Sequence, residues 1–229
     1  MKLYFSNGSP FARKVRIVLA EKNLAFDADV SDGLRALGSM PAPTQAVPVL
    51  EDGALCLWES DLIVDYLLRT YPDSKPPNAK PPVADAAHPP LSPWLARPEF
   101  HWQDMATLAT IASCAESLVN LQLLKPDGLG PQNSEYLARQ KARFERCLDW
   151  LEQRVTDEGF APGWFSIMDI GLICPIIYCE ARNVMPWRGR PKLEALVARH
   201  EARPSMLATP INVLAPSAPR FRMERIPVA

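Results

Sequence analysis

The first twenty residues change from one hydrophobic period to another, as expected for a strand followed by a helix. Residues 2–5 (KLYF) have strand character and lead into a turn of small residues. Apolar side chains then recur at helical spacing over residues 11–19, behind Ser9-Pro10, which has the form of an N-cap and a first helical proline. The pattern predicts a helix whose apolar face packs on a sheet. Its polar side chains are expected on the other face: Arg13, Lys14 and Glu21.

A second strand and an irregular segment are expected after this helix. Residues 25–30 alternate with a period of two, and the crossover through the helix makes this strand parallel to the first. Residues 31–46 contain several glycines and prolines, which predicts an irregular segment with one short helix around residues 34–37.

A β-hairpin and a further helix complete the first part of the chain. The apolar segments 47–50 and 54–57 flank a turn that contains Asp-Gly. A helix is expected from Glu59 until the chain approaches Pro72, because the residue before a proline is disfavoured in a helix. The order strand, helix, strand, irregular segment, hairpin and helix is that of a thioredoxin-like domain.

The composition changes sharply at Pro72, where the hydrophobic periodicity ends. Up to Pro98 the chain carries three Pro-Pro pairs, and proline-rich segments act as extended, semi-rigid spacers. We therefore expect a thioredoxin-like domain at residues 1–75, a proline-rich linker at 76–98 and an all-helical domain at 99–229.

Only helical periodicity remains beyond residue 99. A long helix is expected from there to about residue 124, ahead of a Pro-Asp-Gly breaker, and a second helix begins near the cap Ser134. Residues 167–181 are apolar on nearly all sides and predict the buried axis of a bundle. The expected fold class is therefore α/β plus all-α, a thioredoxin-like domain followed by a helical bundle.

The charge balance argues against nucleic-acid and membrane partners. The chain carries 25 Lys and Arg residues against 26 Asp and Glu residues, so no basic field attracts phosphate groups. No apolar run approaches the length of a membrane span, and the N-terminus does not have the pattern of a signal peptide. We expect a globular cytoplasmic protein with no nucleic-acid and no membrane partner.

Cysteine and histidine usage argues against a metal site. The five cysteines lie in apolar segments without a C-x-x-C pair and are expected to be buried thiols. The three histidines lie far from one another in sequence, whereas a zinc site needs clustered ligands. No metal cofactor is expected.

Three short motifs place polar groups where a ligand fits. Ser9 puts a hydroxyl at the mouth of the first helix, and Ser6 is a weaker candidate for the same role. Pro48 cannot donate a ladder hydrogen bond, which leaves room for a ligand beside it. Glu59-Ser60 begins a helix whose free N–H groups suit a carboxylate, while Glu59 suits an ammonium group. Each motif also has a purely structural explanation, as a helix cap or an edge residue.

A fourth motif is expected to act in folding. Ser166-x-x-Asp169 has the spacing of a capping box ahead of the apolar helix, with Asp in place of the usual Glu or Gln. Loss of a helix cap costs about 0.5 to 2 kcal/mol of stability.

In this order, the motifs resemble those of cytosolic-type glutathione transferases. The segment SPFARKVRIVLAEK is similar to the first helix of that family, and its SPFA stands at the place of the C-P-Y-C or C-P-F-A motif of glutaredoxins and omega-type transferases. Val47-Pro48, Glu59-Ser60 and the capping box match later motifs of the family, so the resemblance spans most of the chain. It implies a homodimer that adds its co-substrate glutathione to a small hydrophobic electrophile.

The resemblance implies a role for each site residue. Ser9 takes the place of the catalytic serine of several bacterial-type transferases and would stabilise the glutathione thiolate. Val47 and Pro48 correspond to a Val-cis-Pro that pairs with the cysteinyl backbone like an added strand. Glu59-Ser60 corresponds to the residues that hold the γ-glutamyl end. Because a serine hydroxyl does not replace a thiolate nucleophile in disulfide exchange, conjugation is favoured over redox chemistry.

The loop before Val47 departs from the family pattern. Many relatives carry a long polar side chain two residues before the proline, where it reaches the glycyl carboxylate, and Ala46 holds that place here. Arg35 and Gln45 are the candidates to replace it.

No motif identifies the second substrate. Its pocket is expected between the domains, lined by Phe11 and by residues of the first C-terminal helix such as Trp102, Met105 or Leu108. Phe11 is also expected at the glutathione site, beside Ser9, with packing on the sheet as its structural alternative. Two alternatives to a transferase stay open: a non-catalytic protein-interaction module of the same fold, like the stringent starvation proteins, and a carrier of hydrophobic ligands.

Overall fold

Strands and helices follow one another in the predicted order. The structure is a computed structural model that describes residues 1–30, 40–71, 91–92 and 98–212. A mixed four-stranded sheet with two helices is followed by helices alone, which confirms the predicted α/β plus all-α class. Several expectations fall outside the described residues: the short helix at 34–37, Arg35 and most of the linker at 76–98.

The bounds of the elements are close to those expected. The strands are β1 (Lys2–Phe5), β2 (Asp27–Val30), β3 (Val49–Asp52) and β4 (Leu55–Trp58). The α-helices are α1 (Pro10–Glu21), α2 (Ser60–Thr70), α4 (His101–Leu124), α5 (Glu135–Arg154), α6 (Ile167–Ala181), α7 (Pro191–His200) and α8 (Pro204–Leu207). Short 3-10 turns, Pro98–Phe100 and Lys125–Asp127, flank α4.

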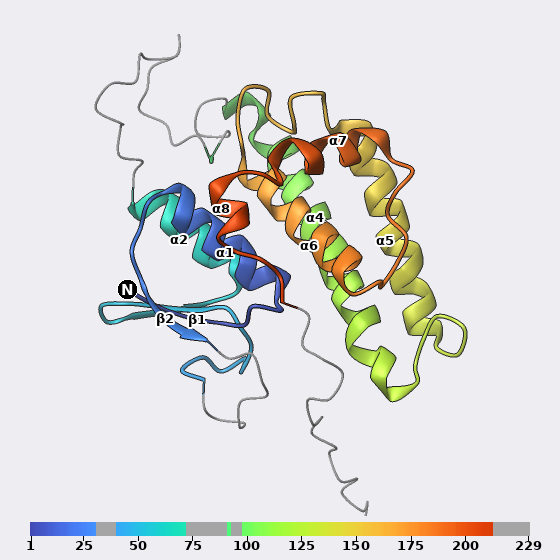
Figure 1. Cartoon of the computed structure of the whole chain (residues 1–229), viewed down its shortest axis with the longest axis horizontal. Helices are drawn as coiled ribbons and strands as arrows, with labels where there is room; N and C mark the ends of the chain where they lie inside the picture. The colour runs from blue at the N-terminus through green and yellow to red at the C-terminus, as the bar shows by residue number, and fades with distance from the viewer. Residues whose placement is uncertain (31–39, 72–90, 93–97, 213–229) are drawn as a thin grey trace, which may run out of the picture.

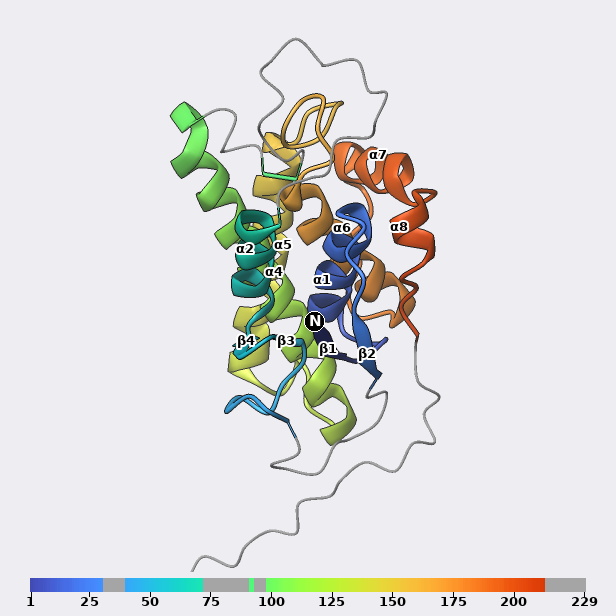
Figure 2. The same cartoon turned by 90° about the vertical axis from the view of Figure 1, so that its left-hand side faces the viewer.

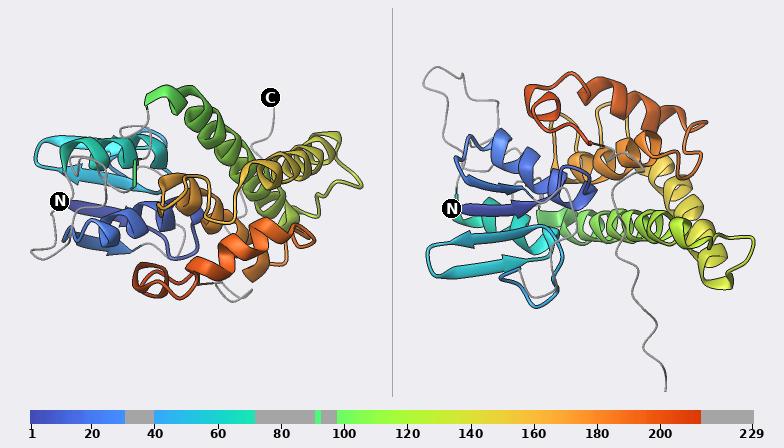
Figure 3. Two further views of the ribbon diagram at one scale, coloured as in Figure 1. Left: turned by 90° about the horizontal axis from the view of Figure 1, so that it is seen from above. Right: turned by 60° about the horizontal axis from the view of Figure 1, so that its bottom comes forward.

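The sheet has the strand order β2-β1-β3-β4. Strand β1 pairs with β2 in parallel, as predicted, and β3 runs antiparallel to both β1 and β4. Gly53 closes the β3–β4 hairpin with a φ of 60°, a left-handed conformation that glycine adopts without steric cost. Figure 1 shows α1 and α2 against the sheet, and Figure 3 shows the strands at one end of the molecule and the helical bundle at the other.

Helix α1 lies at the centre of the molecule, and its surroundings correct one expectation. It contacts α2, α6 and α8 (Figure 2). Arg13 and Lys14, expected on a polar outer face, are only 4% and 7% exposed, because the C-terminal helices cover the side of α1 that the sheet leaves open. A buried cation requires polar partners. Arg13 donates hydrogen bonds to the carbonyl oxygens of Met206, at 3.2 Å, and Thr209, at 2.6 Å.

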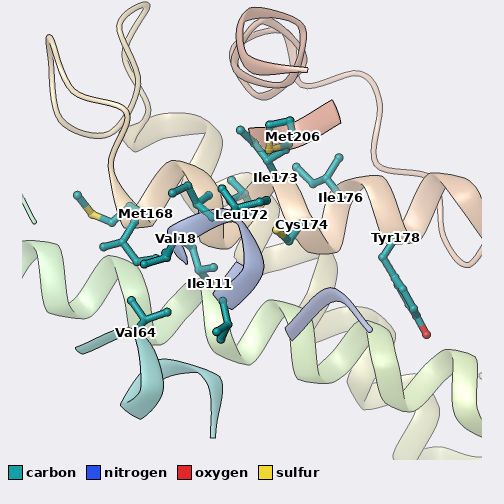
Figure 4. Close-up of a cluster of buried hydrophobic side chains, with 14 of the residues drawn as sticks. Val18, Val64, Ile111, Met168, Leu172, Ile173, Cys174, Ile176, Tyr178 and Met206 are labelled. Carbon is teal, nitrogen blue, oxygen red and sulfur yellow. The ribbon is translucent and has the colours of Figure 1, made fainter. Parts of the chain in front are cut away.

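One hydrophobic core runs from the sheet into the bundle. Helix α6 is its axis, as predicted, since every residue from Ile167 to Ile176 is buried. Figure 4 shows Val18 of α1, Val64 of α2 and Ile111 of α4 around it. Each fully buried aliphatic side chain of this size contributes roughly 1.5 to 3 kcal/mol, so the packing on α6 ties the two halves of the chain together.

Helix α4 requires a correction to the expected absence of a long apolar run. With its flanking turns, Pro98–Asp127, it is long and apolar enough to cross a membrane when judged by length and composition alone. The core helix of a soluble protein meets the same criterion, and α4 packs against α5 and α6.

The predicted capping box is present at the start of α6. Ser166 Oγ accepts a hydrogen bond from the N–H of Asp169 at 3.4 Å, and Asp169 Oδ2 accepts from the N–H and the hydroxyl of Ser166 at 2.7 and 2.6 Å. Both residues are completely buried. Burial raises the pKa of Asp169, and its hydrogen bonds act in the opposite direction. At the start of α5, Ser134 forms a simpler cap by accepting from the N–H of Leu137 at 3.3 Å.

His200, the last residue of α7, is buried in an environment that disfavours its charge. Its ring lies 4.4 Å from that of Phe165, measured between centroids, and within the described part of the chain its buried Nε2 has no hydrogen-bond partner. Burial lowers the pKa of His200 from its ordinary value of 6.5 to about 4, with smaller effects from the positive charges of Arg203 and Arg199.

We expect Ser166→Ala to lower the free energy of unfolding by about 2 kcal/mol and Ser134→Ala by about 1 kcal/mol. The difference arises because Ser166→Ala also removes a hydrogen-bond donor from a buried carboxylate. Urea unfolding of both variants measures it. Equal losses would contradict the structural role given to the buried box.

We expect the protein to lose stability as the pH falls from 6.5 towards 4. The unfolded chain takes up a proton on His200 near its ordinary pKa, whereas the folded chain resists until about pH 4. The loss reaches about 3 kcal/mol. His200→Phe should remove this part of the pH dependence of the free energy of unfolding, while His101→Phe, at the partly exposed start of α4, serves as the control and should retain it.

Candidate functional site

The strand register brings three separate motifs to one end of the sheet. Tyr4 near the end of β1 pairs with Val49 at the start of β3, and Val49 pairs with Trp58 at the end of β4. The turns that follow β1 and β4 and the segment that precedes β3 therefore meet at this end. They carry Ser9, Val47-Pro48 and Glu59-Ser60.

Ser9 is the N-cap of α1. Its backbone is extended, with φ −91° and ψ 123°, and its Oγ accepts a hydrogen bond from the N–H of Ala12 at 3.2 Å. The hydroxyl proton is thereby left to donate to another acceptor. Ser6, the weaker candidate, lies earlier in the turn and accepts from the N–H of Gly8 at 3.2 Å. The hydroxyl of Ser9 and the N-terminal end of the α1 dipole both suit an anion at this point.

Arg182 brings a positive charge to the same turn, although no sequence motif marks it. It follows α6, and its guanidinium lies over the ring of Tyr178 at 5.0 Å. A Cβ placed on Gly8 would lie 2.7 Å from an Arg182 nitrogen, so the missing side chain of Gly8 admits the guanidinium. No local pattern in the sequence indicates this contact, because Gly8 and Arg182 lie far apart along the chain.

The peptide bond between Val47 and Pro48 is cis, as the resemblance implied. Pro48 is buried and directly precedes β3, so Val47 lies two residues before Val49, the first paired residue of that strand. Ala46, which stands where many relatives carry a long polar side chain, is exposed. Gln45 was a candidate to replace that side chain, but its amide already forms hydrogen bonds within its own loop. The Gln45 side-chain amide donates to the carbonyl oxygens of Met40 and Ala42 at 3.1 and 2.7 Å.

Helix α2 begins directly after Glu59, in an unusual way. Glu59 has a φ of 69°, a left-handed conformation that costs a non-glycine residue on the order of 1 to 3 kcal/mol and recurs at functional sites. Its side chain is exposed and forms no cap hydrogen bond. Ser60, the first helical residue, is 5% exposed and presents the free N–H groups of the helix start.

Phe11 borders a narrow recess of about 10 Å³ where α1, α2, α4 and α6 meet. Lys14 and Asp61 also line it, and Lys14 Nζ lies 2.5 Å from Asp61 Oδ1. The sequence placed Lys14 on an outer face, and no motif singled out Asp61 for a role. Neither residue was predicted at the site.

A larger hollow of about 390 Å³ lies between α2 and α4. Met105 and Leu108, two of the residues proposed for the second-substrate pocket, line it, whereas Trp102 is 79% exposed and does not. Asp65, Arg69 and His101 supply polar groups at its wall.

Other predicted residues lie outside this site. Ser166 and Asp169 close the start of α6, whereas Phe11 faces the Gly171 to Pro175 part of that helix. Within the described ranges, no group of three or more His, Cys, Asp or Glu side chains is placed to hold a metal ion. Three of the cysteines are buried as expected, but Cys56 and Cys147 are only partly buried. Cys56 lies on the edge strand β4, and Cys147 lies beside the fully buried positions of α5.

Comparisons with known proteins agree with this arrangement. The family model described as "Glutathione S-transferase, N-terminal domain" matches residues 3–77, and the model described as "Glutathione S-transferase, C-terminal domain" matches residues 134–199. The first match covers Ser9, Val47-Pro48 and Glu59-Ser60.

The chain is also similar to individual proteins over most of its length. It is 32% identical to glutathione S-transferase theta-1 of Bos taurus over 84% of this chain and 75% of that protein, and 28% identical to the uncharacterized GST-like protein YibF of Escherichia coli K12 over 91% and 98%. A crystal structure of a glutathione S-transferase from Methylobacterium radiotolerans in complex with glutathione sulfonate superposes with a TM-score of 0.71, at 26% identity over 98% of each chain.

Proposed function

Because the chain belongs to the glutathione S-transferase superfamily, we propose that it binds glutathione at the end of the sheet and adds its thiolate to a small hydrophobic electrophile. The observation that carries the proposal is the meeting of three elements at that end: the Ser9 hydroxyl, the cis Val47-Pro48 bond and the start of α2. Each has the chemistry that one part of the tripeptide needs.

The cysteinyl part of glutathione would lie along Val47. A proline after it supplies no N–H, so the peptide backbone of a ligand is the natural partner for the polar groups of Val47 in an added-strand geometry. The γ-glutamyl end would lie at the start of α2, where the Ser60 N–H groups and hydroxyl suit its carboxylate and the Glu59 carboxylate suits its ammonium group.

The sulfur would lie against Ser9. A free thiol has a pKa of about 8.5, so only a few per cent is thiolate at neutral pH. A hydrogen bond to a charged acceptor contributes roughly 1.5 to 3 kcal/mol, and a helix N-terminus roughly 0.3 to 1 kcal/mol. At about 1.4 kcal/mol per pKa unit, the two effects together lower the pKa of the bound thiol by roughly one to three units, of which the hydroxyl supplies roughly one to two. No separate general base is needed.

The glycyl end is the weakest part of the proposed complex. Ala46 offers no polar side chain, and the Gln45 amide is held by the loop of residues 40–45. Binding would therefore depend on the cysteinyl and γ-glutamyl parts, which predicts a modest affinity. The electrophile would approach beside Phe11, which borders the recess between the two halves.

Membership in the superfamily implies a soluble protein, and we further propose a cytoplasmic homodimer. Exposed apolar side chains of α2 and α4 support a second copy as the partner: Leu62, Trp102 and Met105 are 51%, 79% and 39% exposed.

We expect Ser9→Ala to raise the pKa of the bound thiol by one to two units and to lower kcat/KM for an aromatic electrophile roughly 10- to 100-fold at neutral pH. The Michaelis constant for glutathione should change little, because the backbone contacts at Val47 and Ser60 remain. Thiolate absorbance against pH and steady-state conjugation kinetics measure both quantities. Ser6→Ala, which removes the neighbouring hydroxyl, is the matched control and should behave like the wild type.

The same measurements separate the alternatives. Glutathione binding without turnover would indicate a carrier of hydrophobic ligands. A folded protein that binds no glutathione would indicate a protein-interaction module. Either result would overturn the proposed reaction, as would a loss of activity in Ser6→Ala rather than Ser9→Ala.

A further inference from the structure

The ion pair between Lys14 and Asp61 joins two helices at their beginnings. Lys14 lies on the second turn of α1, and Asp61 is the second residue of α2. Lys14 Nζ and Asp61 Oδ1 are 2.5 Å apart. The Lys14 side chain is 9% exposed and that of Asp61 is 59% exposed, so the bridge reaches from the interior to the surface.

The Lys14 side chain passes between α1 and α6 on its way to α2. A Cβ placed on Gly171 of α6 would lie 3.3 Å from Ile111 Cγ2 and 4.0 Å from Lys14 Cδ. The stem of Lys14 therefore passes beside Gly171 of α6, and its ammonium group reaches Asp61 of α2. Within the described part of the chain, Asp61 is the carboxylate that pairs with it.

The start of α2 has no side-chain cap. Helices α1, α5 and α6 each begin with a serine whose hydroxyl accepts a backbone hydrogen bond, whereas α4, α7 and α8 also begin without a side-chain cap. Helix α2 follows the left-handed Glu59, which forms no side-chain cap. What distinguishes α2 from the other uncapped helices is the positive φ of its N-cap residue, and the bond from Lys14 to the first turn of α2 restrains this helix start.

We propose that Lys14 and Asp61 are positioning residues for the γ-glutamyl half of the glutathione site. This inference rests on the proposed function. The pair fixes the first turn of α2 relative to α1, and with it the distance between Ser60 and Ser9. Because binding depends on both helix starts at once, a shift of α2 weakens the hold on the γ-glutamyl end. The thiol, which contacts only the start of α1, keeps its ionisation.

The experiment compares Asp61→Asn with the conservative Asp61→Glu and with the double variant Lys14→Met/Asp61→Asn. We expect the Michaelis constant for glutathione to rise about tenfold in Asp61→Asn, with kcat and the pKa of the bound thiol nearly unchanged. Asp61→Glu should recover most of the affinity. The double variant buries no unpaired charge, so its free energy of unfolding in urea should return towards that of the wild type. Its Michaelis constant for glutathione should stay raised. If Asp61→Asn does not fold, the double variant alone tests the inference.

A second ion pair on α1 provides the matched control. Arg203 binds Glu21 at the other end of the helix, with nitrogen–oxygen distances of 3.1 and 2.7 Å. Arg203→Met/Glu21→Gln should change stability without changing the Michaelis constant for glutathione.

Four outcomes would overturn the inference. Two of them are an unchanged Michaelis constant for glutathione in Asp61→Asn and a wild-type Michaelis constant in the double variant. If the wild type binds glutathione and its activity depends on Ser9, either result overturns this inference and leaves the proposed function intact. If Arg203→Met/Glu21→Gln raises the Michaelis constant for glutathione as much as Asp61→Asn does, the effect reflects a general loss of stability and not the position of α2. A wild type that binds no glutathione overturns both this inference and the proposed function.

Discussion

Burial of α1 is the constraint on which the rest of the structure depends. The helix is covered by the sheet-side elements and by α6 and α8, yet it carries cations at Arg13 and Lys14. Burying a charge without a partner costs on the order of several kcal/mol of free energy, so each of these cations requires a polar or anionic group beside it. Arg13 fixes the carbonyl groups that end α8, and Lys14 fixes the start of α2. Two distant parts of the chain are thus held in place by one helix.

Much of the fold follows from local patterns in the sequence. The hydrophobic periods of β1, α1 and α6 and the Asp-Gly turn of the hairpin are local properties, so these elements lie within one or two residues of their expected positions. The burial of Lys14 was not predictable in this way. A helical period indicates that one face packs, but it does not reveal that a second domain covers the opposite face.

The candidate site shows the same division. The residues Ser9, Val47-Pro48 and Glu59-Ser60 are recognisable because each belongs to a short motif, and the strand register then brings them together. Gln45 and Arg182 depend on contacts that no short motif indicates. The Gln45 amide is occupied by carbonyl groups of its own loop, and Arg182 reaches Gly8 from the far end of α6.

The hydrogen bonds from Arg203 and Ser205 to Glu21 restrict how the C-terminal segment can move relative to α1. Glu21 accepts hydrogen bonds from both side chains at the end of α1, while Arg13 is bound to the same C-terminal segment near its start. Because α1 is shared by the core of both halves, moving α8 and the segment after it away from α1 would break several polar contacts together. The proposed binding of glutathione would therefore have to proceed with α1 and the C-terminal helices held together.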